Sequence, residues 1–470
     1  MRLARALREA GRGRDAARVE GELARSAPTP EERRAHLRAA VDALMVVGAI
    51  DEGLAIARDI GAELGLDLGS SGAARALRLA GGALRILLDP TASGQPRRGP
   101  GDARARERCD TLWPVARALV FIDPLVGVDA MLRALGEARA SGDARRVKRV
   151  TGPIAGFLLG TIPGFKATAR RWVDALDDEA ARLLWSSYLC GTQGDLIGSL
   201  AAGRAAMERL ADAPDAGWER LQAISIVARG LFGRGHFATL RALVNAHLPD
   251  AERQANLYAM ATLTSYLLLP TLTAGRVEEA RGLARWTHAT WLPGRFSPIS
   301  FYADRCLRLA DAYEGRAASA AADIAAGRDA FAKAGGYRIV ISRFDHDLME
   351  ARIALALTAP VAGLWPVAKL LDRLAKLALP EGPAHAELLR ASVAARDGRR
   401  EAALGALGRA IAMLEHIGVD LEAQVGRLRQ AQLRGEAAPA EAARAALRQL
   451  GVRDPDRWAE VVAPGYAALT

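Results

Sequence analysis

Glycines that begin a turn recur at nearly constant spacing along the chain. At separations of 41, 40 and 40 residues, the series runs Gly194, Gly235, Gly275 and Gly315. The next member, Gly398, lies 83 residues on, or two periods, and residues 358–360 occupy the skipped turn. A glycine supplies the left-handed residue that ends one helix and lets the next helix turn back. This spacing predicts stacked helical hairpins, each burying its apolar face only against its neighbours.

Apolar residues recur at helical spacing on both sides of these glycines. Before Gly235 the stripe includes Leu221, Ile224 and Leu231, and after Gly398 it includes Leu404. A tetratricopeptide (TPR) unit repeats about every 34 residues, so the longer period indicates longer helices or longer inter-hairpin loops. The loop at residues 291–298 favours the second explanation. We therefore predict an all-α fold, a right-handed superhelix of TPR-like hairpins. By analogy with known solenoids, we expect the first helix of each hairpin to line a concave face.

Composition agrees with a helical array. The chain has 470 residues, too many for one compact core, and half of them are apolar. Aromatic residues are only 5%, and alanine, leucine and arginine dominate. These three residue types favour helix and close interhelical packing. The sequence shows little sign of a sheet.

We expect four segments along the chain. Residues 1–88 are N-terminal helical repeats, because turns like those downstream already occur there. Residues 89–108 form a loop rich in proline, glycine and arginine that breaks the helical period. Residues 109–436 form the main helical-repeat solenoid, and residues 437–470 form C-terminal capping helices.

The net charge of +10 raises the question of nucleic-acid binding. Only five of the 64 basic residues are lysines, so the excess is almost all arginine. Two basic clusters stand out, at residues 97–108 and 145–149, and neither is interleaved with aromatic residues that could stack on bases. We interpret both clusters mainly as solvated surface, and a phosphate or acidic-partner site is the alternative.

Cysteine usage and hydropathy favour a soluble, cytoplasmic protein. Cys109, Cys190 and Cys306 are too widely spaced for a zinc knuckle or a disulfide framework, so we expect them to be small core residues. The segment 1–15 is charged and lacks the apolar centre of a signal peptide. The longest apolar stretch, 153–165, is shorter than the roughly 20 residues that a membrane-spanning helix needs.

Phosphate-binding and kinase motifs are missing. The closest approach to a P-loop is Gly160–Lys166, which has the wrong spacing, a proline and no hydroxyl after the lysine, and we interpret it as an interhelical turn. The chain has neither a His-Arg-Asp catalytic loop nor an Asp-Phe-Gly motif. The segment 69–72 does not match a nucleophile elbow, and Ser70 or Ser71 is expected to cap a helix. We therefore predict no enzyme activity and no cofactor.

The histidines provide no metal site on a helix face, because none forms an i, i+4 pair. They are His36, His236, His247, His288, His346, His385 and His416. The run 345–347, Asp-His-Asp, with Glu350 is the best catalytic candidate, because a carboxylate can tune a neighbouring imidazole. Phe344 and Leu348 mark the buried stripe of this helix, so we expect His346 to face solvent.

The eight tryptophans occur about once per repeat. We interpret most of them as core residues. Trp291, which lies beside a loop, is one that could anchor a partner.

A longer pattern of residues resembles a known family. It extends through residues 48–55 and 64–66, the segment 108–129, the helix 344–356 and the closing segment 455–465. The distinctive residues of the central segment are Arg108, Cys109, Asp110, Thr111, Leu112, Trp113, Leu119, Asp123, Pro124, Gly127 and Asp129. The pattern resembles the C-terminal helical-repeat region of large bacterial serine/threonine protein kinases, in which a kinase domain and a signalling NTPase module precede such a solenoid.

The resemblance implies a regulatory or sensory solenoid of a kinase-type signalling system. It carries over no catalytic residue, because the matching region of that family holds none. The kinase and NTPase modules have no counterpart in this sequence, which begins inside the repeat array. Either the chain is a stand-alone descendant or its start has been placed internally.

Our leading hypothesis is a non-catalytic scaffold that binds a protein or peptide on its concave face, with a kinase or NTPase module as one candidate partner. The alternative is an effector-sensing module of a signalling NTPase or transcription regulator, with a small molecule inside the superhelix. Nucleic-acid binding through the arginine clusters is a weaker third hypothesis. The sequence does not identify which residues contact the partner.

Overall fold

The structure, a computed structural model, contains helices and no strands in the part of the chain that it describes. The described residues are 2–68, 72–88, 94–97, 99, 101–120, 122–162, 164–213, 216–291, 296–359 and 361–466. The predicted all-α class of TPR-like helical hairpins is confirmed.

Packing divides the chain into two compact units. The first comprises Met1–Leu189, Ala205–Leu221 and His247–Ala261. The second comprises Cys190–Arg204, Gln222–Ala246 and Thr262–Thr470.

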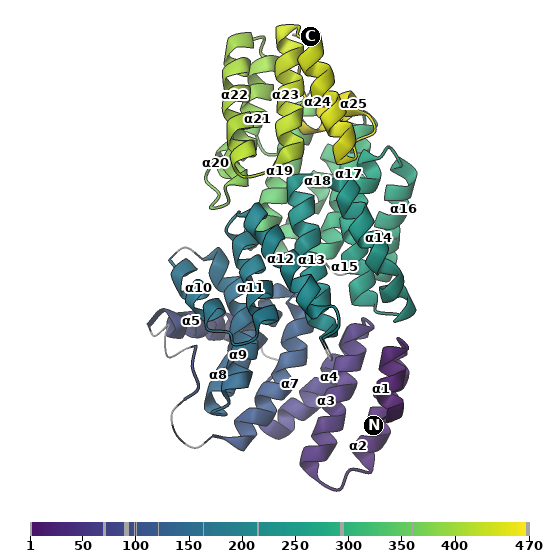
Figure 1. Cartoon of the computed structure of the whole chain (residues 1–470), viewed down its shortest axis with the longest axis vertical. Helices are drawn as coiled ribbons and strands as arrows, with labels where there is room; N and C mark the ends of the chain where they lie inside the picture. The colour runs from purple at the N-terminus through teal and green to yellow at the C-terminus, as the bar shows by residue number, and fades with distance from the viewer. Residues whose placement is uncertain are drawn as a thin grey trace. The chain divides into compact units, whose positions relative to one another are not determined.

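Helices α1 to α5 and α7 to α11 lie mainly in the first unit. Their bounds are α1 (Arg2–Glu9), α2 (Gly13–Arg25), α3 (Pro30–Val46), α4 (Ile50–Leu64), α5 (Gly72–Leu88), α7 (Ala103–Leu119), α8 (Pro124–Ala140), α9 (Ala144–Pro153), α10 (Lys166–Asp174) and α11 (Glu179–Thr192). A π-helical turn, Ile154–Leu158, and a short 3-10 helix, Leu159–Thr161, follow α9. Consecutive helices pack side by side, α2 on α3 and α7 on α8 among them (Figure 1).

Helices α11 to α15 contribute residues to both units. The remaining bounds are α12 (Leu196–Leu210), α13 (Gly217–Arg234), α14 (Phe237–Arg253), α15 (Leu257–Thr273), α16 (Val277–Thr290), α17 (Pro298–Tyr313), α18 (Ala317–Lys333), α19 (Val340–Ala356), α20 (Val367–Ala375), α21 (Glu381–Arg396), α22 (Arg400–His416), α23 (Asp420–Arg434), α24 (Ala437–Leu450) and α25 (Pro455–Val462). A 3-10 turn, Gly336–Arg338, precedes α19. Helices α21 to α24 illustrate the hairpin packing clearly (Figure 1).

The turn glycines have the predicted conformation. Gly194, Gly235, Gly275, Gly315 and Gly398 all have φ between +72° and +81°. Each lies between two helices that pack on one another or on their neighbours. The prediction that the 40-residue spacing reflects left-handed glycine corners is therefore confirmed.

One expectation about the repeats is wrong. Corners in the second unit do not contact only their neighbours, because some lie against segments almost 190 residues later in the sequence. A Cβ atom on Gly194 would lie 2.3 Å from Pro380 Cδ, and one on Gly235 would lie 2.1 Å from Leu421 Cβ. The backbone N–H of Arg453 also donates to the Thr273 carbonyl, at 2.9 Å. These corners therefore hold distant hairpins together.

The predicted loop 89–108 is shorter than expected. Helix α7 begins at Ala103, where the Asp102 side chain accepts a hydrogen bond from the Arg104 N–H, at 2.8 Å. Ala105 is fully buried, so the arginine-rich sequence continues as helix after Asp102. Residues 89–93, 98 and 100 of that segment lie outside the described residues.

No helix in the described part of the chain combines the length and the apolar character needed to cross a membrane.

At the C-terminal end of the described residues, α24 packs on α23, and α25 contacts α17, α19, α23 and α24. Trp458 of α25 is buried beside Tyr313, with ring centroids 6.3 Å apart.

Candidate functional site

Helix α19 packs against five other helices within the second unit. It contacts α17, α18, α20, α21 and α25, and most of its residues are buried. Two groups of charged side chains project from it in different directions. The first contains His346, Asp347 and Glu350 of the predicted catalytic candidates. The second contains the remaining candidate, Asp345, with partners that were not singled out from the sequence.

The prediction that His346 and its neighbours face solvent is wrong. The His346 side chain is 2% exposed, and those of Asp347 and Glu350 are fully buried. Phe331 stacks on the His346 ring, with centroids 4.5 Å apart. The prediction assumed one buried stripe through Phe344 and Leu348, but a helix that is covered all round buries its other faces too.

Arginines from α18 and α20 neutralise the two buried carboxylates. Arg373 donates to Asp347 at 2.9 and 3.2 Å, and Arg328 pairs with Glu350. Glu350 Oε1 also accepts the backbone N–H of Trp365, at 2.7 Å. Burial raises the pKa of both carboxyl groups, and the arginines oppose this effect.

His346 is a poor general base in this setting. Burial, and then the positive charges of Arg308, Arg328 and Arg373, lower its pKa to about 3. Its Nδ1 atom lies 3.7 Å from Glu350 Oε2, and neither atom has a hydrogen-bond partner. The side chains of His346, Asp347 and Glu350 are closed to solvent, so a substrate cannot reach them. They belong to the interior packing of the fold.

The second group of side chains, which we call the interior charged cluster, lies on the first helices of several hairpins. Its members come from α13, α17, α19 and α23 of the second unit and are Arg229, Tyr302, Arg305, Asp345, Arg352 and Glu422.

Two ion pairs form the centre of this cluster. Arg305 Nη1 donates to Asp345 Oδ1 at 2.6 Å, and both side chains are 9% exposed. Arg352 Nη2 donates to Glu422 Oε1 at 3.3 Å. His385 of α21 places Nε2 3.7 Å from the same Glu422 oxygen. Five first helices thus contribute to, or border, a single polar network.

Burial and neighbouring charges shift the pKa values of groups in this cluster. Burial opposes the ionisation of Glu422, but His385 and Arg352 outweigh it and lower the pKa of this carboxyl to about 2. Burial, followed by the charge of Asp345, raises the pKa of Tyr302. The Glu422 carboxylate therefore remains ionised at neutral pH.

Arg229 differs from the other arginines of the cluster. It lies in no ion pair with another described residue within 4.0 Å, and Tyr302, Tyr266 and Asp345 are the groups that act on it most. Burial opposes its charge, yet these neighbours leave its pKa raised. Beside it, Arg305 lies over the ring of Phe232, 5.3 Å from the centroid. Arg229 is thus a half-buried cation without a carboxylate of its own.

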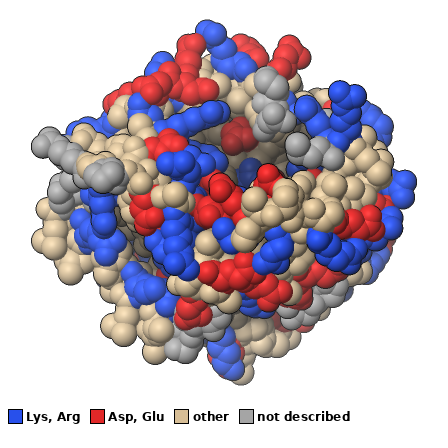
Figure 2. Space-filling view, turned by 90° about the horizontal axis from the view of Figure 1, so that it is seen from below, with Lys and Arg blue, Asp and Glu red and all other residues tan. Residues whose placement is uncertain are grey.

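The basic cluster at residues 145–149 is largely neutralised. Arg146 and Arg149 both donate to Asp110, at 2.7 and 2.9 Å, and Lys148 pairs with Asp177. In the cluster at residues 97–108, Arg108 donates to Glu137 at 2.9 Å, and Arg104 donates to the main-chain carbonyl of Glu63. Figure 2 shows blue and red side chains interspersed across the visible face. The pairing at residues 145–149 disfavours a phosphate-backbone site there.

Other predicted residues fall into three groups. Cys109 and Cys306 are buried, as expected, whereas Cys190 is half-buried. Trp291 is only 1% exposed, so the prediction that it could anchor a partner is wrong, because the indole packs into the core. Ser70 and Ser71 lie outside the described residues. Among the described residues, no group of three or more His, Cys, Asp and Glu side chains is arranged to hold a metal ion.

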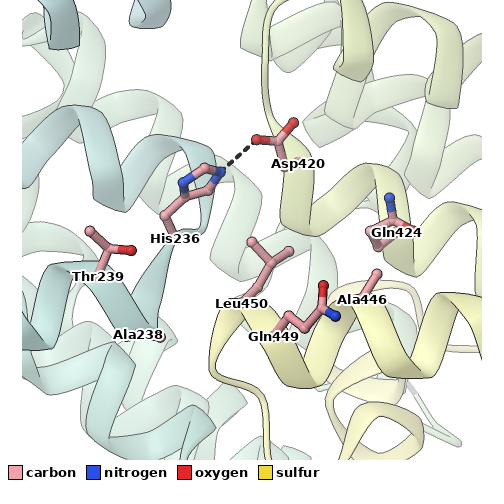
Figure 3. Close-up of a pocket in the computed structure, with 8 residues that line it drawn as sticks. All are labelled: His236, Ala238, Thr239, Asp420, Gln424, Ala446, Gln449 and Leu450. Atoms are coloured by element: carbon pink, nitrogen blue, oxygen red, sulfur yellow. Dashed lines mark hydrogen bonds and ion pairs between the residues drawn. The ribbon is translucent and has the colours of Figure 1, made fainter.

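A third feature is a cleft of 330 Å³ within the second unit. Its lining comes from the corner between α13 and α14, from α23 and from α24 (Figure 3). The residues are His236, Ala238, Thr239, Asp420, Gln424, Ala446, Gln449 and Leu450.

The chain is a helical-repeat protein. No family model matches it, and no curated protein matches its sequence. One solved structure that matches the chain is described as the crystal structure of Rap protein complexed with competence and sporulation factor. The two chains are 14% identical, the match covers 89% of this chain and 100% of the other, and the TM-score is 0.44. A likeness at this level does not transfer a partner or an activity.

Proposed function

We propose that this chain is a non-catalytic binding module that recognises an extended peptide or protein segment through the interior charged cluster. The observation that supports the proposal is the concentration of charged side chains on α13, α17, α19 and α23. Such groups stabilise a fold less than well-packed apolar residues of similar size. Their presence on several first helices therefore favours a role in recognition.

Unsatisfied polar atoms near the cluster indicate which groups meet the partner. Arg352 Nε and Glu381 Oε2 are buried without a hydrogen-bond partner. Buried polar atoms are nearly always hydrogen-bonded in folded proteins, so these two atoms favour a ligand that supplies the missing groups. A peptide main chain provides both donors and acceptors at regular intervals.

The charges set the chemistry of the partner. Arg229, without a carboxylate of its own, provides a site for an acidic side chain or a terminal carboxylate of the peptide. Glu381 and Glu422 provide acceptors for main-chain N–H groups or for a basic side chain. We therefore propose a peptide of mixed charge rather than an apolar helix.

The wider role that we propose is regulation in a kinase-type signalling system. Its support is the resemblance of the repeat residues to the solenoid of bacterial serine/threonine kinases. In this role the chain positions a partner and performs no chemistry itself, which agrees with the closed surroundings of His346.

A selection experiment tests the proposal. A random peptide library is displayed against the full chain, and the affinity of an enriched peptide is measured by calorimetry. Arg229→Gln and Glu381→Gln are expected to weaken binding about tenfold or more, roughly 1.4 kcal/mol each. The control, Arg409→Gln on α22, removes a 64% exposed cation and is expected to bind as the wild type does. No enrichment, or equal affinities for all variants, would contradict the proposal, as would ATP turnover that a point substitution abolishes.

A further inference from the structure

The cleft in Figure 3 lies beside an ion-paired contact that joins two distant segments. Arg234 and His236, at the corner between α13 and α14, both bond to Asp420 Oδ2, at 2.8 and 2.6 Å. Arg234 Nε also donates to the Gly418 carbonyl, at 3.1 Å. We call this contact the Asp420 clasp. It connects residues 184 to 186 positions apart in the chain.

Several hydrogen-bonding groups in the cleft have no partner within the described protein. Both clasp bonds reach the same oxygen of Asp420, which leaves its Oδ1 atom without a hydrogen bond. The Thr239 hydroxyl and the carboxamides of Gln424 and Gln449 also line the cleft and make no hydrogen bond to the protein. Ala446 and Leu450 provide an apolar surface between them.

The chemistry of this lining selects an uncharged ligand. Arg234 cancels the charge of Asp420, so the cleft holds no surplus charge for an ion. Carboxamides and hydroxyls both donate and accept hydrogen bonds, as the hydroxyl groups of a polyol do. The apolar patch suits the C–H face of such a molecule, and the volume lies at the lower end of ligand pockets, which span roughly 300 to 1,000 Å³.

We propose that this cleft is an effector site for a small polyhydroxylated molecule, a monosaccharide, disaccharide or polyol. The ligand bridges the α13–α14 corner to α23 and α24, because the hydrogen-bonding groups that line the cleft come from all three of these elements. Binding therefore tightens the Asp420 clasp.

The site also communicates with the interior charged cluster. Asp420 and Gln424 lie one helical turn apart on α23, and Glu422 lies between them on a different face. A ligand that fixes the first turn of α23 consequently fixes Glu422 in its contact with Arg352. This coupling rests on the proposed function, whereas ligand binding in the cleft does not.

The test uses the full chain and a panel of glucose, ribose, trehalose and myo-inositol, each at millimolar concentration, with inorganic phosphate as a charged comparison. Thermal unfolding screens the panel, and calorimetry measures affinity. Gln449→Leu and Thr239→Val alter exposed side chains, so both variants are expected to fold. Gln430→Leu, on α23 outside the cleft, is the matched control.

At least one neutral member of the panel is expected to raise Tm in the wild type and in Gln430→Leu, with at least a tenfold loss of affinity in Gln449→Leu and Thr239→Val. The proposal is overturned if no neutral member binds, if binding survives in both cleft variants, or if phosphate alone binds. Peptide affinity, measured separately with and without the bound polyol, tests the coupling. If a peptide binds through Arg229 with the same affinity whether or not the polyol is bound, the coupling is contradicted and the proposed function is retained.

Discussion

Gly235 lies directly against Leu421, so that a methyl group on the glycine would be 2.1 Å from the leucine Cβ atom. The two residues are 186 positions apart in the chain. Gly235 therefore has two reasons to lack a side chain: a left-handed backbone with φ of +75° and close packing on a distant helix. The regular corner of one hairpin is also the docking point of another.

Replacing this glycine separates the two effects. Gly398 has a similar φ of +72°, but a Cβ atom there would meet nothing within 4 Å, which makes Gly398→Ala the matched control. We expect Gly398→Ala to cost about 1 kcal/mol of unfolding free energy from backbone strain. Gly235→Ala adds a clash and is expected to cost about 3 kcal/mol. Urea denaturation measures the unfolding free energy of both variants. Equal losses would show that Leu421 moves aside for the added methyl group without a cost in stability.

The Arg305–Asp345 pair should behave as one unit. Removing either partner leaves a buried charge, so Arg305→Ala and Asp345→Ala are each expected to cost about 3 to 5 kcal/mol. The double substitution is expected to cost much less than the sum, because it leaves no uncompensated charge. A double-mutant cycle from denaturation curves gives the coupling. Strict additivity would contradict the pairing.

His346 should make the fold sensitive to mild acid. Its pKa is about 3 in the folded chain and about 6.5 when unfolded, so acidification below pH 6.5 protonates only the unfolded form. Wild type is expected to lose about 2 to 3 kcal/mol relative to His346→Phe between roughly pH 6.5 and 4.5. The raised pKa values of Asp347 and Glu350 act with the opposite sign in both proteins and largely cancel in this comparison. If the free energy of unfolding of His346→Phe and of His346→Gln changed with pH just as that of wild type does, the low pKa of His346 would be contradicted.

Thiol labelling checks the burial of the cysteines. Burial raises the pKa of Cys109 to about 11 and that of Cys306 to about 12, so almost no thiolate is present near neutral pH. We expect iodoacetamide to label Cys190 first in the native chain and the other two only after unfolding. Mass spectrometry of the labelled peptides identifies the sites. Fast native labelling of Cys306 would show that the packing of α17 is wrong.

Local patterns explain how much of this fold the sequence predicts. Left-handed glycines and helical stripes depend on neighbouring residues, so the corners and the all-α class followed directly from their spacing. The direction of His346 did not, because it depends on α17, α18, α20 and α21 closing around α19. The contact between Gly235 and Leu421 has no local signal at all.

One ion pair of the interior charged cluster has a signal in the sequence. Arg305 and Asp345 are 40 residues apart, about one repeat period, and lie on successive first helices, α17 and α19. Opposite charges about one period apart can pair across the array. The pairing of Arg352 with Glu422, 70 residues away, follows no such period, so the structure is needed to see it.

Hydrogen exchange of the full chain with and without a selected peptide tests the central claim most directly, since it reports where the partner binds. We predict added protection on α13, α17, α19 and α23, the helices that carry the interior charged cluster, and little change on α16, α18 and α22. Protection confined to those second helices, or to the first unit, would contradict the account.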